Sequence, residues 1–273
     1  MYIIDVLIKI IKMSIIQTAE RVCHKELSDN FVFQRSLLAY VEAAKIVSGT
    51  VLEIGTGSGY GVEIIASNTD KFITIDKYET NILSNDNVEF IKMNVPPLID
   101  IPDSSFDFVI TFQVIEHIKK DEEFVKEIYR VLKNKGKLIV TTPNKKMSLT
   151  RNPWHIREYT INELDTLLRK DFQSVKKIGD FGKEKINEYY YQNKKSVEKI
   201  TRFDLFNFQY ILPRQLLKIP YDIANRMNRK KLLKDHTSLV SEISMNDYYL
   251  DNTTDECFDL FYVAEKVSSP INL

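Results

Sequence analysis

The 273-residue chain is poor in cysteine, glycine and proline, and it has no excess of charge of either sign. Two cysteines, Cys23 and Cys257, are too few for a disulfide framework or a four-cysteine zinc site, so a reducing, cytoplasmic location is expected. Eight glycines and eight prolines exclude collagen-like and linker-rich designs. The 38 basic residues balance 38 acidic ones, which disfavours a dedicated nucleic-acid-binding protein.

Uninterrupted apolar segments of about 18 residues, the length needed to cross a bilayer, do not occur. The most apolar segment is MYIIDVLIKIIKMSII at residues 1–16, where Asp5, Lys9 and Lys12 form one polar stripe on a predicted helix. No small-residue cleavage site follows, which disfavours a secretory signal. We interpret the segment as a helix docked on the protein or on a second subunit. The alternatives are a helix on a membrane surface and a true start at Met13.

Hydrophobic residues make up 44% of the chain, and from residue 50 onward they alternate between strand and helix patterns. The predicted strands are TVLEIG (50–55), KFITID (71–76), VEFIKM (88–93), FDFVITFQ (106–113), KGKLIVTTP (135–143), FQSVKKIG (172–179) and CFDLFYVAEK (257–266). Helices are predicted at 33–44, 59–66, 122–132 and 160–168. In the last of these, Thr160 and Glu163 have the spacing of a capping box.

This alternation predicts an α/β fold, namely a doubly wound, seven-stranded, mostly parallel sheet with helices on both faces. The rhythm breaks at residues 182–256, which are tyrosine-rich, then basic, and contain no clear strand. The predicted organisation is therefore N-terminal helices at 1–48, an α/β domain at 49–181 and 257–273, and a lid-like helical insertion at 182–256.

A glycine-rich turn follows the first predicted strand in the segment V-L-E-I-G-T-G-S-G-Y-G. Glycines at positions 55, 57 and 59 permit a tight turn and a close approach of the backbone to a ligand. Asp76 ends the second strand about 20 residues later, where an acidic side chain reaches ribose hydroxyls in this architecture. The pattern favours a ligand that contains a nucleoside.

Two residues bear on which nucleoside is bound. A dinucleotide fingerprint requires a third glycine at position 60, which is Tyr60 in this chain. Glu53 precedes the turn and is expected to repel a pyrophosphate and to attract a cationic ligand. S-adenosylmethionine has an ammonium, a sulfonium and a ribose diol but no phosphate, so it fits best. The alternatives are an NAD-type oxidoreductase site, a nucleoside-binding protein without catalysis, and a glycine turn without a ligand.

The segment E-I-G-T-G-S-G-Y-G resembles motif I of class I S-adenosylmethionine-dependent methyltransferases. The resemblance spans about residues 18–179, including S-S-F-D and E-H at positions 104–107 and 116–117, and it returns at the last strand. The lead-in at residues 20–44 and N-P-W-H-I-R-E-Y-T-I-N-E-L at 152–164 are similar to bacterial polysaccharide-synthesis and ubiquinone-type O-methyltransferases. This resemblance implies methyl transfer to an oxygen of a sugar, a carrier-linked glycan or another small metabolite.

The cofactor-binding residues follow from the motif positions and from the resemblance. They are Glu53, Gly55, Thr56, Gly57, Gly59, Asp76, Lys77, Asn94, Val95, Gln113 and His117. Asn94 stands where the family has an aspartate that contacts the adenine amino group, and its side-chain carbonyl can accept the same hydrogen bond. Only about 11 residues separate Asp76 from Val88, so the helix usually found there is expected to be short or missing.

A hydroxyl acceptor is helped by a general base, and histidine has a suitable pKa. His155 and His117 are the predicted catalytic residues because both follow strands at the carboxyl edge of the sheet, where ligands bind. The structural alternative for His155 is a loop residue that caps the next helix. The structural alternative for His117 is a residue packed near the cofactor. His24 is a further candidate for lining the acceptor pocket. No two histidines have a metal-ligand spacing and no acidic residues cluster around them in sequence, so no metal is predicted.

The segment Arg214–Lys234 is both basic and amphipathic. We interpret it as a lid helix with a solvated basic face, with contact to a membrane surface or an anionic carrier-linked substrate as the alternative. Nucleic acid is disfavoured because no recognition motif accompanies the charge. The oligomeric state is left open.

Overall fold

The computed structural model describes residues 26–80, 82, 85–202, 204 and 207–267. The predicted helix at 1–16 and His24 lie outside this part of the chain. The chain forms two compact units. The α/β unit comprises Gln34–Ser148, His155–Lys183 and Met245–Leu273, and the helical unit comprises Met1–Phe33, Leu149–Trp154 and Glu184–Ser244.

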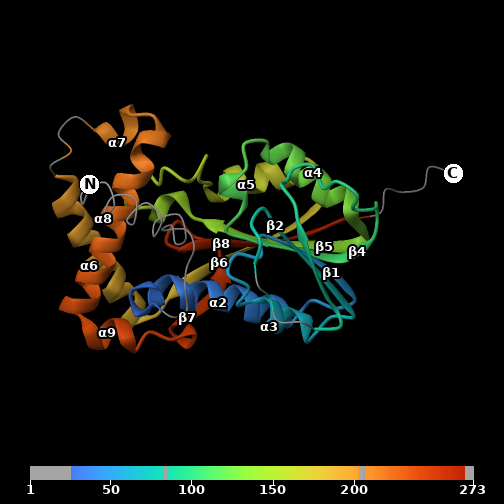
Figure 1. Ribbon diagram of the computed structural model, residues 1–273, viewed down its shortest axis with the longest axis horizontal. Coiled ribbons are helices and arrows are strands. Elements are labelled where there is room, and N and C mark those ends of the chain that lie inside the picture. Colours follow the sequence, from blue (N-terminus) through green and yellow to red (C-terminus); the bar gives the residue numbers. More distant parts are fainter. Residues whose placement is uncertain (1–25, 81, 83–84, 203, 205–206, 268–273) are drawn as a thin grey trace, which may run out of the picture. The chain divides into compact units, whose positions relative to one another are not determined.

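A sheet of eight strands forms the centre of the α/β unit, in the order β3-β2-β1-β4-β5-β8-β6-β7 (Figure 1). The strands are β1 (Thr50–Ile54), β2 (Lys71–Asp76), β3 (Val88–Lys92), β4 (Phe106–Phe112), β5 (Leu132–Pro143), β6 (Ser174–Gly182), β7 (Tyr248–Asn252) and β8 (Asp259–Glu265). The first five strands run parallel, whereas β8 is antiparallel to β5 and β6, and β7 is antiparallel to β6. The prediction of a doubly wound, mostly parallel α/β fold is confirmed.

The sheet has one strand more than the seven predicted. The additional strand is β7, which lies in the segment assigned to the insertion but belongs to the α/β unit. Its alternation is weak, because Tyr248 is buried whereas Tyr249, Asp251 and Asn252 are exposed. Short, polar edge strands of this kind leave little hydrophobic pattern in a sequence.

Helices cover both faces of the sheet (Figure 1). On one face, α4 (Asp121–Val131) and α5 (Ile161–Leu168) contribute Phe124, Ile128 and Leu164 to a core in which these side chains are fully buried. On the other face, α3 (Val62–Ala66) and the part of α2 (Asn30–Ala44) within the α/β unit pack through buried apolar side chains such as Ala43 and Ile65. Burying side chains of this size stabilises the fold by roughly 1.5–3 kcal/mol for each large one.

The ends of α4 and α5 follow from their sequences. Helix α4 has three acidic residues in its first turn and Arg130 in its last, so its charges complement the helix dipole. The capping box of α5 is confirmed: the Thr160 hydroxyl accepts a hydrogen bond from the Glu163 amide at 3.3 Å, and the Glu163 carboxylate accepts one from the Thr160 amide at 2.7 Å. Short 3-10 helices complete the chain at Leu27–Asp29 (η1), Ile115–His117 (η2), Lys145–Met147 (η3) and Met245–Asp247 (η4).

The helical unit contains α6 (Glu184–Thr201), α7 (Phe208–Ile211), α8 (Arg214–Asp235) and α9 (Thr237–Ser241). The sequence had suggested a single solvated basic face on the helix that is now α8. The basic residues of α8 do not all lie on such a face. The fully buried Asp29 carboxylate binds the guanidinium groups of Arg226 and Arg229 at 3.0 and 2.8 Å. A buried charge requires such pairing, and this requirement turns two of the basic side chains inward. None of the helices in the described part of the chain combines the length and the apolar composition needed to cross a bilayer.

Candidate functional site

The strand order places a topological switch point at the carboxyl ends of β1 and β4. From β1 the chain continues through β2 and β3 to one side, whereas β4 and β5 lie on the other side. In open α/β sheets, ligands bind at such a switch point. The predicted glycine turn follows β1, and Gln113 and His117 follow β4, so sequence positions about 60 residues apart meet at this edge.

The glycine turn has a backbone that favours glycine at each of its three positions, with φ angles of 102° at Gly55, 59° at Gly57 and 81° at Gly59. A Cβ atom on Gly55 would lie 2.4 Å from Cγ2 of Val114, so a side chain is excluded there for steric reasons as well. Around Gly57, by contrast, a Cβ atom would meet no heavy atom within 4 Å. The turn therefore presents open space at its central glycine, where a ligand can approach the backbone.

Asp76 holds the turn from the end of β2. Its carboxylate accepts hydrogen bonds from the backbone amides of Gly57 at 3.0 Å and Tyr78 at 2.9 Å. The Thr80 hydroxyl donates to the Gly57 carbonyl at 2.9 Å. Asp76 therefore lies beside the central glycine of the turn, and a carboxylate offers about four acceptor positions in all.

Glu53 does not face the crevice, and the prediction that it selects the ligand by direct electrostatic contact is wrong. Its side chain is 1% exposed and points into the interior. One carboxylate oxygen accepts a hydrogen bond from the Tyr40 hydroxyl at 2.7 Å and the other from the Thr74 hydroxyl at 2.5 Å. The parallel register pairs Glu53 with Thr74 on β2, and Tyr40 comes from α2.

Burial raises the pKa of Glu53 to about 7, although the hydrogen bonds from Thr74 and Tyr40 oppose this shift. Glu53 is therefore only partly charged near neutral pH. The prediction also assumed a full negative charge at this position, and that assumption does not hold. Thr56 belongs to the same buried network, since its hydroxyl lies 2.6 Å from that of Thr74. Any contact that Thr56 makes with a ligand must therefore come from its backbone.

The remaining predicted cofactor residues line the same edge to different extents. Lys77 and Asn94 are exposed, and Val95 is half-buried. Gln113 is half-buried and has a φ angle of 57°. Its backbone N–H donates a hydrogen bond to the Thr141 carbonyl at 3.0 Å. Non-glycine residues seldom adopt this conformation outside turns and functional sites. Between β2 and β3, the described residues form no helix, in agreement with the short spacing.

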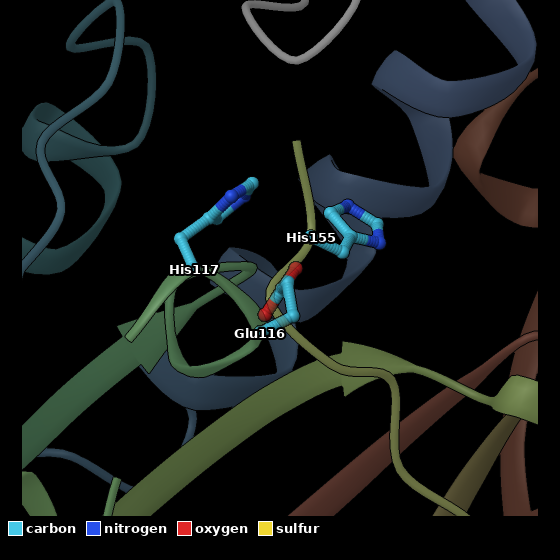
Figure 2. A group of neighbouring side chains, drawn as sticks. All are labelled: Glu116, His117 and His155. Atoms are coloured by element: carbon cyan, nitrogen blue, oxygen red, sulfur yellow. The ribbon is translucent and has the colours of Figure 1, made fainter. Parts of the chain in front are cut away.

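The two predicted catalytic histidines lie together, as Figure 2 shows. The imidazole rings of His117, in η2, and His155 have centroids 5.0 Å apart and are nearly perpendicular, at 78°. The Glu116 side chain lies below both rings in Figure 2, and Glu116 is 1% exposed. The Ile156 amide donates to the Glu116 carbonyl at 2.7 Å, which fixes the loop of His155 to η2.

Acidic residues surround this pair, contrary to the expectation from sequence. Nδ1 of His155 lies 2.8 Å from a Glu158 carboxylate oxygen, and the Thr142 hydroxyl donates to Glu116 at 3.0 Å. One ligand atom each from Glu116, His117 and His155 lie within 4.8 Å of one another. The sequence argument had considered only spacing and clustering along the chain, and it missed a group assembled from two loops about 40 residues apart.

A second polar group in the α/β unit had no sequence signal. Arg35 on α2 binds Asp259 on β8 at 3.0 Å, and Asp180 on β6 is also buried. Burial raises the pKa of Asp259, while Arg35 and then His155 oppose the shift. Burial and the neighbouring Asp259 raise the pKa of Asp180. The members of this group are more than 75 residues apart along the chain, so no local motif could reveal it.

Comparison with known proteins agrees with this geometry. The sequence model of the methyltransferase domain family matches residues 52–140, which contain the glycine turn, Asp76 and His117. A probable S-adenosylmethionine-dependent methyltransferase of Mycobacterium tuberculosis is 38% identical over 150 residues, covering 51% of this chain and 54% of the relative. The ubiquinone biosynthesis O-methyltransferase of Bos taurus is 27% identical over 116 residues, covering 38% of this chain and 31% of the relative.

Among solved structures, an S-adenosylmethionine-dependent methyltransferase of Thermotoga maritima superposes with a TM-score of 0.50 at 19% identity. The match covers 86% of this chain and 92% of that one, and at this identity it concerns the fold alone. The chain spans about half the length of the mycobacterial relative it matches. Residues 52–140, with the glycine turn and the strand order around them, therefore match a methyltransferase domain, and the mycobacterial relative named above is described as S-adenosylmethionine-dependent.

Proposed function

We propose that the protein transfers a methyl group from S-adenosylmethionine to an oxygen atom of a small-molecule acceptor. The observation that carries the proposal is the glycine turn with Asp76 beside it, at the switch point of the sheet. The open space at Gly57 fits a nucleoside lying against the backbone, and Asp76 offers acceptors for the two ribose hydroxyls. When bound, S-adenosylmethionine supplies an electrophilic methyl group.

The other residues of the turn and edge have roles that follow from their positions. Gly55 and Gly59 keep the turn free of side chains, and Gln113 is held by Thr141 at the end of β4. The side-chain carbonyl of Asn94 and the backbone amide of Val95 are proposed to bind the adenine. Lys77 is exposed beside Asp76 and is proposed to flank the ribose.

On the acceptor side, the proposed residues are His117 and His155, which lie together at the same edge. The prediction that one of them takes a proton from the acceptor stays a prediction. Oxygen as the target is supported by the similarity to the bovine enzyme, whose name describes an O-methyltransferase. A sugar or a carrier-linked glycan is the acceptor class that the sequence resemblance implies.

The test of the cofactor proposal is calorimetric titration of the full chain with S-adenosylhomocysteine, the product that retains the ribose. We expect Asp76→Ala to weaken binding by about 1–3 kcal/mol, or roughly 5- to 150-fold, because the ribose hydrogen bonds are lost. Since Asp76 also holds the Gly57 and Tyr78 amides, thermal unfolding of the variant must be measured in parallel.

Asp70→Ala is the matched control, because Asp70 is exposed and lies at the opposite end of β2. It is expected to bind as the parent does. Unchanged affinity in a folded Asp76→Ala variant would remove Asp76 from the site. Tight binding without turnover on any of a panel of hydroxylated acceptors would favour the alternative function, a nucleoside-binding protein without catalysis.

We further propose that α8 touches an anionic membrane surface. Four apolar side chains at helical spacing are largely exposed: Leu216 (64%), Ile219 (58%), Ile223 (49%) and Met227 (67%). Lys230 and Lys234, also exposed, continue the same face at the next helical positions. An apolar stripe extended by basic residues complements the headgroups and acyl boundary of an anionic bilayer.

A further inference from the structure

We propose that Glu116, His117 and His155 bind a divalent transition-metal ion, of which Zn²⁺ is the representative used below. The three side chains come from two segments, η2 and the loop that follows η3, and they converge at the carboxyl edge of the sheet (Figure 2). Their nearest ligand atoms already lie within 4.8 Å of one another. The role given to the ion below rests on the methyl-transfer function proposed above, but the binding of the ion does not.

The distances require only a small contraction. Three ligand atoms around an ion with bonds of about 2.1 Å lie about 3.4 Å apart in a tetrahedral site. Rotation of the His117 ring, which is only half-buried, can bring its ligand atom from at most 4.8 Å toward this separation, while the His155 ring keeps its bond to Glu158. The backbone needs no rearrangement, because the Ile156 amide already ties the loop of His155 to Glu116.

The surroundings have the features of a metal site beyond the ligands themselves. Histidine ligands commonly give their second ring nitrogen to a carboxylate, which orients the ring. Here Nδ1 of His155 is held by Glu158 at 2.8 Å. Glu116 is likewise held, by the Thr142 hydroxyl at 3.0 Å. A cation between the carboxylate and the two rings would compensate the burial of Glu116.

The donor set selects the class of ion. Two imidazole nitrogens and one carboxylate oxygen suit Zn²⁺, Fe²⁺, Co²⁺ or Ni²⁺, whereas Mg²⁺ and Ca²⁺ prefer oxygen ligands alone. Three protein ligands leave at least one coordination position open, as in catalytic sites. In this protein that position would receive the acceptor oxygen and hold it in line with the methyl group.

The experiment uses the full chain after dialysis against a chelator and its removal, titrated calorimetrically with ZnCl₂ and, separately, with MgCl₂. We expect one Zn²⁺ per chain with a dissociation constant of micromolar or below, and no saturable binding of Mg²⁺. Substituting Co²⁺ should give a visible absorption spectrum characteristic of histidine ligation. His117→Ala, His155→Ala and Glu116→Gln should each weaken Zn²⁺ binding at least tenfold, whereas His236→Ala, a control in the helical unit, should not.

Absence of stoichiometric Zn²⁺ binding would overturn the proposal, and so would parental affinity in the His117→Ala variant. Because Glu116 is buried, the Zn²⁺ affinity of its variant counts only if the variant unfolds at a temperature near that of the parent. If it does not, His117→Ala decides the question. Titration of the same samples with S-adenosylhomocysteine keeps the two proposals separate. Binding of the nucleoside without Zn²⁺ refutes the metal site alone, and the reverse refutes the proposed cofactor alone.

Discussion

Glu53 shows how one buried side chain couples the stability of the glycine turn to pH. It lies on β1 immediately before the turn, with its carboxylate bonded to Tyr40 and Thr74. Its pKa is raised by burial from an ordinary 4.5 to about 7. Between these values the folded protein binds more protons than the unfolded chain, so its stability falls as the pH rises.

We predict that Glu53→Gln removes much of this dependence, because glutamine retains the side-chain shape and one acceptor oxygen and has no titrating proton. Relative to the parent, the free energy of unfolding of the variant should increase by about 2 kcal/mol between pH 5 and pH 7.5. Urea unfolding at the two pH values measures this difference. Glu63→Gln, at an exposed position on α3, serves as the control and should follow the parent. Equal pH dependence of unfolding in the parent and in Glu53→Gln would contradict the assignment of this dependence to Glu53.

At the scale of residues, sequence patterns identified the turn correctly and the orientation of Glu53 incorrectly. The glycine spacing is a local property of the backbone, and its positive φ angles follow directly. The direction of the Glu53 side chain depends on Tyr40, from the preceding helix, and on Thr74, from the neighbouring strand. Partners separated by 13 and 21 positions leave no trace in the motif itself.

Helix α8 is the element whose exposed face has the clearest consequence. Its apolar stripe, Leu216 to Met227, is solvent-exposed, whereas Arg226 and Arg229 turn inward to Asp29. The sequence predicted the amphipathic pattern, but the pattern alone could not say which side faces solvent. The buried Asp29 decides this, and it lies almost 200 residues earlier in the chain.

We predict that the protein sediments with vesicles containing phosphatidylglycerol and not with vesicles of phosphatidylcholine alone. The double variant Ile219→Ser, Ile223→Ser should lower binding by about tenfold or more, because two apolar side chains no longer enter the bilayer boundary. Ile200→Ser, at a 47% exposed position on α6, is the matched control and should bind as the parent does. Equal binding to both kinds of vesicle, or a loss of self-association instead of vesicle binding, would contradict a role for α8 at membranes.

At the scale of the whole molecule, the fold was predictable because the central parallel strands β1, β2 and β4 are largely buried, apolar segments. The exceptions were β7, a polar edge strand, and the groups that long-range topology assembles, such as Glu116 with His117 and His155. The methyltransferase domain family matches only residues 52–140, the part that contains the glycine turn and Asp76.

The central claim, that the glycine turn binds an adenosyl amino acid and not a dinucleotide, is tested most directly by parallel calorimetric titrations of the full chain. One sample receives S-adenosylhomocysteine and the other receives NAD⁺. We predict saturable binding of one S-adenosylhomocysteine per chain and no measurable binding of NAD⁺. Saturable binding of NAD⁺ with no response to S-adenosylhomocysteine would contradict the claim.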